Sequence, residues 1–332
     1  GTSLHAADLS ALTVAANGQE PVETEHLEAL IKPVLVVPNL PARAVHDSWQ
    51  RRDGKAVLLR PDQSTLELTL NPDVQEDIGD RLARSRVPYA AVVLIKPDTG
   101  AIKAWVEHRE INSIGRDKAL GLTGNKAPAA SIFKIISTAA LLEAGVDPSR
   151  ATCFRGGWRN LRPTHLEAPN GSSRCETLGE ALGRSSNAVF GQLTAKHLKR
   201  GDLIAKAEDF LFHSHIPFDV DTLASTVSEG DDTLRRAQTA AGLRGSTLSP
   251  LHGALIAATI ANDGVMMRPH LVVSDSLQAG LRFEPGRMHT AVDAKIAQRI
   301  GKMMVHTVRE GTARKSFHPR PASLAGIDIA GK

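Results

Sequence analysis

Aromatic side chains are scarce in this sequence, whose 332 residues include eight Phe, three Trp and a single Tyr. Proteins that bind single-stranded nucleic acid stack bases on aromatic rings, so this chain offers little material for that contact. Strong charge of one sign is lacking too, because the formal net charge is +4 and the basic residues are scattered. A polyanion site needs positive charge concentrated on one face, so the sequence predicts no nucleic-acid partner.

Long hydrophobic runs are also missing. A membrane-spanning helix needs about 18 or more apolar residues, and the longest apolar stretches here are only Ala90–Ile95 and Ala254–Ala261. The chain begins at Gly1 without a signal peptide. A membrane anchor or another domain upstream of Gly1 therefore stays open.

Cysteine is limited to Cys153 and Cys175, which flank a stretch rich in Gly, Pro and Asn. We interpret the pair as a disulfide formed in an oxidising compartment, with two reduced, buried thiols as the alternative. His213 and His215 lack a nearby third metal ligand, and no glycine-rich phosphate loop follows a strand. The sequence therefore predicts no metal and no nucleotide cofactor.

The length predicts about two domains at ~150 residues each. Residues 1–65 read as an irregular N-terminal segment, and residues 66–332 as the main domain. The apolar run Tyr89–Ile95, a Pro-Asp-Thr-Gly turn and the alternating run Ala101–Val106 predict a hairpin whose first strand is covered on both faces. Ser323–Lys332 alternates in part like a strand. Strands at both ends with helices between them indicate an α+β fold, with an antiparallel sheet flanked by helices and an all-helical part.

Helix starts are marked by capping residues. Asn71 before Pro72 suits the start of one helix, and Thr177 with Glu180 has the spacing of a capping box. Ser249 before Pro250 marks another start. Three more predicted helices cover Ser131–Leu142, Asn187–Lys199 and Val292–Arg309.

Ser131 and Lys134 form the one S-x-x-K triplet in the chain. Positions i and i+3 share a helix face, so the hydroxyl and the amine can lie within hydrogen-bond reach. A neutral lysine could then take the hydroxyl proton and make Ser131 a nucleophile. This requires a lysine pKa well below about 10.4, which burial or a second cation could produce.

Two further triplets complete a pattern. Ser185-Ser186-Asn187 is the one S-x-N in the chain, and the chain ends in Ala330-Gly331-Lys332. S-x-x-K, then S-x-N, then a strand lysine is the pattern of serine transpeptidases and β-lactamases. From residue 66 to 332 the sequence resembles the transpeptidase domain of penicillin-binding proteins. Supporting similarities lie in Thr69–Gln75, Lys96–Ala104, Ala240–Leu251, Ile260–Gly264 and Glu310–Ala313.

The resemblance implies a D,D-transpeptidase that cross-links peptidoglycan. Ser131 would be acylated by a stem peptide or by a β-lactam, with Lys134 as its base. Ser185 would relay a proton, and Asn187 would hold Lys134 and the substrate amide. Lys332 would be the first residue of the family's K-T-G motif, close to Ser185 and the substrate carboxylate. The implied location is the cell envelope, on the periplasmic side of the inner membrane, with partners in a cell-wall synthesis complex.

Two departures from the family pattern stand out. Ala129-Ala130 occupies the place of a frequent Pro-Gly pair, which could alter the turn before the nucleophile. The chain also stops at Lys332, so the rest of the third motif, the following strands and one oxyanion-hole N–H are not in it. We therefore expect a fragment that is truncated at its C-terminus, inactive and poorly stable unless the rest is supplied.

Two alternatives remain open. In a D,D-carboxypeptidase or β-lactamase, water would take the acyl group, and Glu167 with Asn170 imitates the E-x-x-N that positions this water in class A β-lactamases. Here that motif precedes the S-x-N triplet instead of following it, which favours a loop carboxylate. The second alternative is a non-catalytic cell-wall scaffold that keeps the fold.

Overall fold

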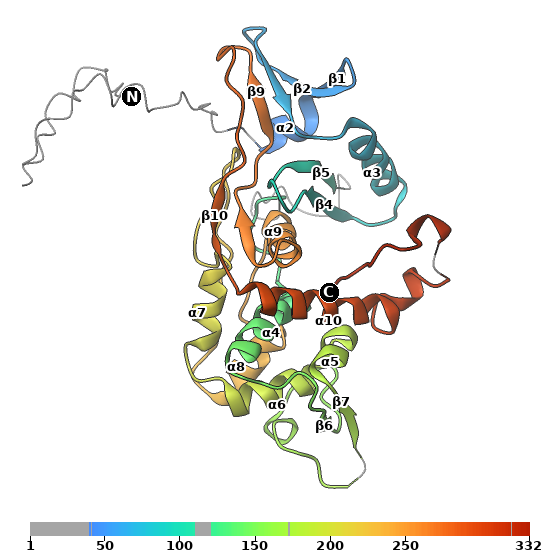
Figure 1. Cartoon of the computed structure of the whole chain (residues 1–332), viewed down its shortest axis with the longest axis vertical. Coiled ribbons are helices and arrows are strands. Elements are labelled where there is room, and N and C mark those ends of the chain that lie inside the picture. Colours follow the sequence, from blue (N-terminus) through green and yellow to red (C-terminus); the bar gives the residue numbers. More distant parts are fainter. Residues whose placement is uncertain (1–39, 41, 110–120, 172, 320) are drawn as a thin grey trace, which may run out of the picture. The chain divides into compact units, whose positions relative to one another are not determined.

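Antiparallel strands and helices occur largely in separate runs along the chain in the computed structural model, which describes residues 40, 42–109, 121–171, 173–319 and 321–332 (Figure 1). All of them lie in one compact unit, Leu35–Lys332. The mixed fold of helices and antiparallel sheet is as predicted. The α-helices are α2 (Ala42–Ser48), α3 (Pro72–Arg84), α4 (Lys134–Glu143), α5 (Leu178–Arg184), α6 (Asn187–His197), α7 (Asp202–Asp209), α8 (Thr233–Ala240), α9 (Pro250–Ala261) and α10 (Ala294–Arg309).

Within the described residues the strands pair in four groups. A four-stranded sheet has the order β1-β2-β3-β9, and three pairs are β4-β5, β6-β7 and β10-β8. The strands are β1 (Trp49–Arg52), β2 (Lys55–Leu59), β3 (Thr65–Leu68), β4 (Tyr89–Ile95), β5 (Ile102–Arg109), β6 (Thr152–Phe154), β7 (Arg174–Glu176), β8 (Val265–Met267), β9 (Val272–Asp275) and β10 (Arg287–Thr290).

Local capping explains where several helices begin. The Asn71 side chain accepts a hydrogen bond from the Val74 N–H at 3.1 Å, with Pro72 in the first turn of α3. Thr177 and Glu180 form the reciprocal capping box of α5. Each such bond satisfies a helix N–H that has no partner within the helix. The predicted starts of both helices are confirmed.

The helix α4 forms the centre of the helical region. Residues Lys134 to Leu142 are all buried, and α4 packs against α5, α6, α7 and α10. The Phe133 ring just before α4 meets Phe212 edge to face, with 5.6 Å between ring centroids. A helix buried on every side is held rigidly by its neighbours, which is the support that a precise site requires.

The N-terminal prediction of an irregular segment is wrong for residues 42–59. These residues form α2, β1 and β2, because β2 and β3 pair as a hairpin and β3 in turn pairs with β9. Residues 1–39 and 41 lie outside the described residues. The strand pairing crosses the predicted boundary after residue 65, and the division into two domains stays a prediction.

Two strand predictions also need correction. Residues 323–332, all of which the structure describes, form no strand: a short 3₁₀ helix (Ala322–Leu324) and an extended tail stand there. Alternation favours a strand only where a neighbouring strand supplies hydrogen bonds. The strand β4 is not buried on both faces either, because its residues are partly exposed and Leu94 is 45% exposed.

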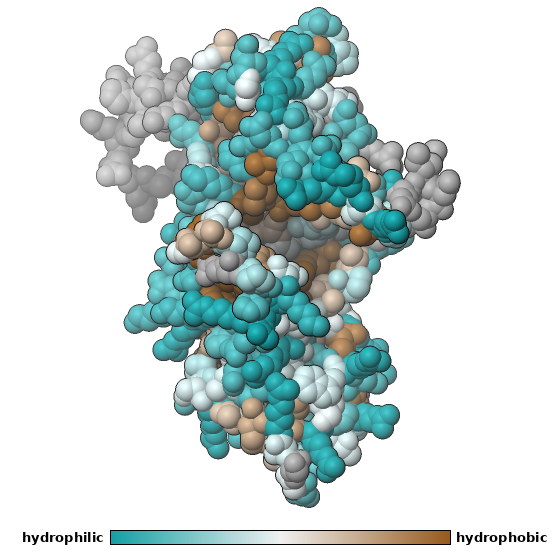
Figure 2. Space-filling view, turned by 90° about the vertical axis from the view of Figure 1, so that its right-hand side faces the viewer, coloured by the Kyte–Doolittle hydropathy of each residue, from teal (hydrophilic) through white to brown (hydrophobic). Residues whose placement is uncertain are grey.

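The surface is mostly polar with one apolar hollow. Figure 2 shows brown side chains gathered in a hollow at the height where Figure 1 places β4 and α9. Among the described strands β4 pairs with β5 alone. In the described part of the chain, no helix has the length and apolar character that crossing a membrane requires.

Candidate active site

Ser131 and Lys134 lie where a 3₁₀ turn, Ala130–Phe133, passes into α4. The Lys134 Nζ is 3.2 Å from the Ser131 Oγ. The sequence predicts one regular helix over these residues, but the 3₁₀ turn brings i and i+3 into line even more directly. The triplet therefore places the amine beside the hydroxyl, as its spacing predicts.

The turn before Ser131 is tight. Ala130 has a φ of 46°, a left-handed conformation that is unfavourable for a residue with a Cβ. Gly242 packs against it: a Cβ added at Gly242 would lie 1.9 Å from the Ala130 carbonyl oxygen. A side chain at position 242 would push the Ser131 turn aside. The Ala129-Ala130 departure therefore leaves the turn intact but with a strained alanine.

Ser185 and Asn187 lie at the junction between α5 and α6 and reach the same point. Ser185 ends α5 in a left-handed conformation (φ 61°), and its Oγ lies 2.9 Å from the Ser131 Oγ. Asn187 opens α6, and its Oδ1 accepts from the Lys134 Nζ at 2.8 Å. Four side chains that the two triplets contribute are thus in one hydrogen-bonded cluster.

The surroundings of Lys134 shift its acid–base behaviour. The side chain is fully buried, and burial, together with the charge of Lys332, lowers the pKa of Lys134 to about 7. Both causes act in the same direction, since burial and a like charge each disfavour an ammonium ion. Near neutral pH a substantial fraction of Lys134 is therefore the uncharged amine, which can accept a proton.

Lys332 lies close enough for its charge to act on Lys134. Burial lowers the pKa of Lys332 itself to about 8. The preceding Gly331 N–H donates to the Met304 carbonyl on α10 at 3.1 Å, which ties the tail to that helix. Lys332 thus also lies near this site, although on an irregular tail and not on a strand.

Two backbone carbonyls complete the cluster, and the sequence reasoning missed both. The Ala241 carbonyl accepts a short hydrogen bond from the Lys134 Nζ, and the Trp158 carbonyl accepts from the Asn187 Nδ2 at 2.7 Å. Any residue type can offer a carbonyl, so composition carries no signal for them. The resemblance of residues 240–251 to the family pattern pointed to the segment that contains Ala241. It did not indicate that the Ala241 carbonyl binds Lys134.

The two cysteines form a disulfide that joins β6 to β7. The loop between these strands contains Trp158, whose ring meets Phe154 edge to face and lies under the Arg174 guanidinium. Because Asn187 binds the Trp158 carbonyl, this cross-linked hairpin is connected directly to the cluster.

The remaining candidate residues lie elsewhere. Glu167 is exposed in the loop between β6 and β7. His213 lies in a turn and His215 follows it in irregular backbone, and their rings contact the backbone carbonyls of Val227 and Thr222 respectively. Within the described ranges, no group of three or more His, Cys, Asp or Glu could hold a metal ion.

The fold and this cluster belong to a known class of domain. A family model described as "Penicillin binding protein transpeptidase domain" matches residues 90–332. Since that match spans well over half of the sequence, the chain belongs to this family.

Curated relatives and solved structures that are similar to this chain belong to the same family. The peptidoglycan D,D-transpeptidase PbpA of Mycolicibacterium smegmatis is 29% identical over 82% of this chain and 60% of its own length. The chain thus spans about three fifths of the curated relatives it matches. Penicillin-binding protein A of M. tuberculosis, solved as an imipenem acyl-enzyme complex, is similar at TM-score 0.66 and 26% identity, over 81% of this chain and 68% of that one. A D,D-transpeptidase domain from Eggerthella lenta gives TM-score 0.64 and 30% identity, over 80% and 70%.

Proposed function

We propose that this chain is a peptidoglycan D,D-transpeptidase that forms an acyl-enzyme through Ser131 and binds β-lactams as substrate mimics. The observation that carries the proposal is the 3.2 Å contact between the Ser131 hydroxyl and a buried lysine whose pKa is about 7. A nucleophilic serine needs a neighbouring base that is neutral at the working pH. The names of the relatives support the same reaction.

Acylation uses the four clustered side chains. The neutral Lys134 amine takes the Ser131 proton while the Ser131 Oγ attacks the carbonyl carbon of the penultimate D-Ala. The peptide C–N bond then breaks, and the leaving D-Ala amine receives a proton through the Ser185 hydroxyl, which lies 2.9 Å from the Ser131 Oγ. In a β-lactam the ring C–N bond breaks instead, and the amine stays attached to the adduct.

Transfer completes the reaction. The amine of a neighbouring stem peptide attacks the ester, the bond from the acyl carbon to the Ser131 Oγ breaks, and Ser131 regains its proton through Lys134. We assign to Asn187 the task of holding the Lys134 amine, and to Lys332 the binding of the substrate carboxylate. Since stem peptides lie outside the cytoplasmic membrane, we place the activity on the periplasmic side of the cell envelope, where the disulfide is stable.

Labelling with a fluorescent penicillin tests the proposal. We expect one molecule of label per molecule of the full-length protein, which all acylation tests below also use, stable to denaturing electrophoresis, and no label on Ser131→Ala at equal thermal stability. The matched control is Ser149→Ala, which removes a hydroxyl from an exposed loop, where the Ser149 Oγ donates to the nearby Asp147 carboxylate, and it should label fully. If the folded full-length protein takes up no label, the proposed function is wrong and the scaffold alternative is favoured. Labelling of the chain that ends at Lys332 would overturn the expectation that this chain is inactive by itself.

The lifetime of the adduct separates the enzyme classes. A transpeptidase keeps its penicilloyl ester for many minutes, whereas a β-lactamase releases it within seconds. Release of free D-Ala from a stem-peptide analogue without an acceptor amine would favour the carboxypeptidase alternative.

A further inference from the structure

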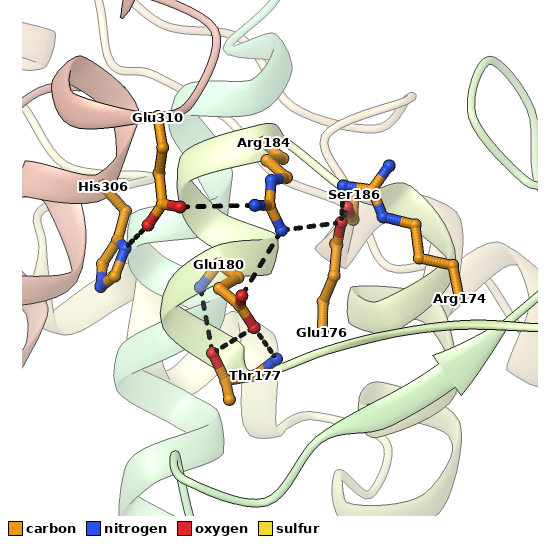
Figure 3. A network of polar contacts seen from close by, with 8 residues as sticks. All are labelled: Arg174, Glu176, Thr177, Glu180, Arg184, Ser186, His306 and Glu310. Atoms are coloured by element: carbon orange, nitrogen blue, oxygen red, sulfur yellow. Dashed lines mark hydrogen bonds and ion pairs between the residues drawn. The ribbon is translucent and has the colours of Figure 1, made fainter.

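A cluster of charged and hydroxyl side chains includes Ser186, the residue between Ser185 and Asn187 (Figure 3). We call its central part, Arg174, Glu176, Arg184 and Ser186, the Glu176 network. Glu176 is fully buried and Ser186 is 1% exposed. Burying a carboxylate lowers the stability of the fold unless fixed partners bind it. The partners of Glu176 are therefore required for this packing.

The side chain of Ser186 does not bind the helix that it precedes. It holds the capping position at the start of α6, where a serine side chain ordinarily accepts a hydrogen bond from the first turn of the helix. In the part of the chain that the structure describes, its side chain makes no such bond. The Ser186 Oγ instead donates a short hydrogen bond to the Glu176 Oε2 (Figure 3). Since both groups are buried, water cannot replace this bond.

Glu176 is itself fixed from several sides. It follows the disulfide-bonded Cys175 in β7, so its backbone is held by the cross-linked hairpin. Its Oε1 forms ion pairs with Arg174 at 2.8 Å and with Arg184 at 3.5 Å. Figure 3 shows Arg184 between this carboxylate and that of Glu310, which caps the end of α10 and lies 3.4 Å from the guanidinium.

The segment that Ser186 anchors needs external support. Ser185 keeps a left-handed backbone conformation, which persists for a non-glycine residue only where the surroundings hold it. Ser185 and Asn187 directly flank Ser186, and both point to the reacting cluster. We propose that Glu176, acting through Ser186, is a positioning residue that holds the Ser185 hydroxyl and the Asn187 carboxamide against Ser131 and Lys134. The inference rests on the proposed function of that cluster.

A double-mutant cycle on acylation tests the inference. Ser186→Ala and Glu176→Gln are compared with their combination, using a fluorescent penicillin and rates per folded chain. We expect Ser186→Ala to lower the limiting acylation rate by up to about 100-fold with little change in penicillin binding, because a displacement of about 1 Å can cost that much. Glu176→Gln should have a smaller effect, and the double variant should be no slower than Ser186→Ala.

Glu310→Gln is the matched control, since Glu310 also contacts Arg184 but not Ser186. It should acylate within about twofold of wild type, as expected for an ion pair with an exposed partner. If Ser186→Ala and Glu176→Gln lower the melting temperature while acylation per folded chain stays unchanged, the residues are merely structural and the inference is wrong. Rate losses that multiply in the double variant would also overturn it.

Hydrogen exchange separates this inference from the proposed function. In the peptide containing Ser185–Asn187, Ser186→Ala should speed amide exchange more than tenfold, and Glu310→Gln should not. If the full-length protein takes no penicillin, the proposed function fails. The exchange measurement still tests the positioning role separately. Faster exchange in Ser186→Ala supports that role, and unchanged exchange refutes it.

Discussion

Two buried lysines in this molecule have opposite surroundings. Lys134 in α4 is fully buried and donates to three neutral oxygens, on Ser131, Asn187 and Ala241. Lys206 in α7 is 8% exposed and lies 2.7 Å from the carboxylates of both Glu143 and Asp209.

The difference shows that burial alone does not make a lysine reactive. Carboxylate partners compensate a buried ammonium ion, so Lys206 acts as the cation of an ion-pair cluster between α4 and α7. Neutral acceptors compensate much less, and Lys332 adds a like charge near Lys134, which lowers its pKa further. The charge of the partners therefore separates a structural lysine from a proposed base.

The largest expected effect comes from Lys134→Met. This change removes the proposed base, so acylation by penicillin should slow about 10³-fold, the usual contribution of a general base. Stopped-flow acylation per folded chain measures the rate, and circular dichroism checks the fold. A variant that keeps more than a tenth of the wild-type rate would exclude Lys134 as the base.

The pH dependence of acylation is the next largest effect. Because the pKa of Lys134 is lowered to about 7, the neutral amine forms as pH rises through 7. The acylation rate should fall about tenfold per unit below pH 7 and level off above about pH 8. A flat profile between pH 5 and 8, or a rise only above pH 9, would contradict this assignment.

The same pKa can be checked without catalysis. An unfolded chain binds the Lys134 proton up to about pH 10, whereas the folded chain releases it near pH 7. Stability of wild type relative to Lys134→Met should therefore rise by about 1.4 kcal/mol per unit between pH 7 and 10, and stay constant below pH 7. Chemical denaturation of both proteins at several pH values measures it.

Lys206→Met completes the comparison with a smaller effect. The two freed carboxylates, 35% and 51% exposed, can turn toward solvent, so the free energy of unfolding should fall by only about 1–2 kcal/mol. Acylation per folded chain should stay within twofold of wild type. A loss beyond tenfold would mean that Lys206 also supports the reaction, and the contrast between the two lysines would fail.

Structural features that depend on residues three or four positions apart could be predicted from the sequence. Asn71 with Pro72 and Thr177 with Glu180 gave the helix starts, because a cap depends on residues three positions apart. The irregular reading of residues 42–59 failed because that sheet depends on β9, far along the chain. Arg60, for example, binds Asp275 at 2.6 Å across 215 positions.

The side chains of the site were predictable, but their supports were not. Spacing points to Ser131, Lys134, Ser185 and Asn187, since each triplet fixes its own members locally. The Ala241 and Trp158 carbonyls could not be found this way, because every residue type has a backbone carbonyl. Glu176 was missed for a related reason: a fully buried carboxylate and a solvated one are the same letter in a sequence.

The smallest expected effect concerns Glu167, the carboxylate of the hydrolase alternative. In a deacylating enzyme this group would hold a water at the ester, and Glu167→Gln would lengthen the life of the penicilloyl adduct severalfold or more. Glu167 is exposed in the loop between β6 and β7, and its motif precedes Ser185 in the chain, so we expect an unchanged lifetime. Mass spectrometry of the adduct over hours measures it, with Asn160→Ala, an exposed position of the same loop outside the motif, as the matched control. A lengthened adduct lifetime in Glu167→Gln alone would mean that water, and not a peptide amine, is the natural acceptor.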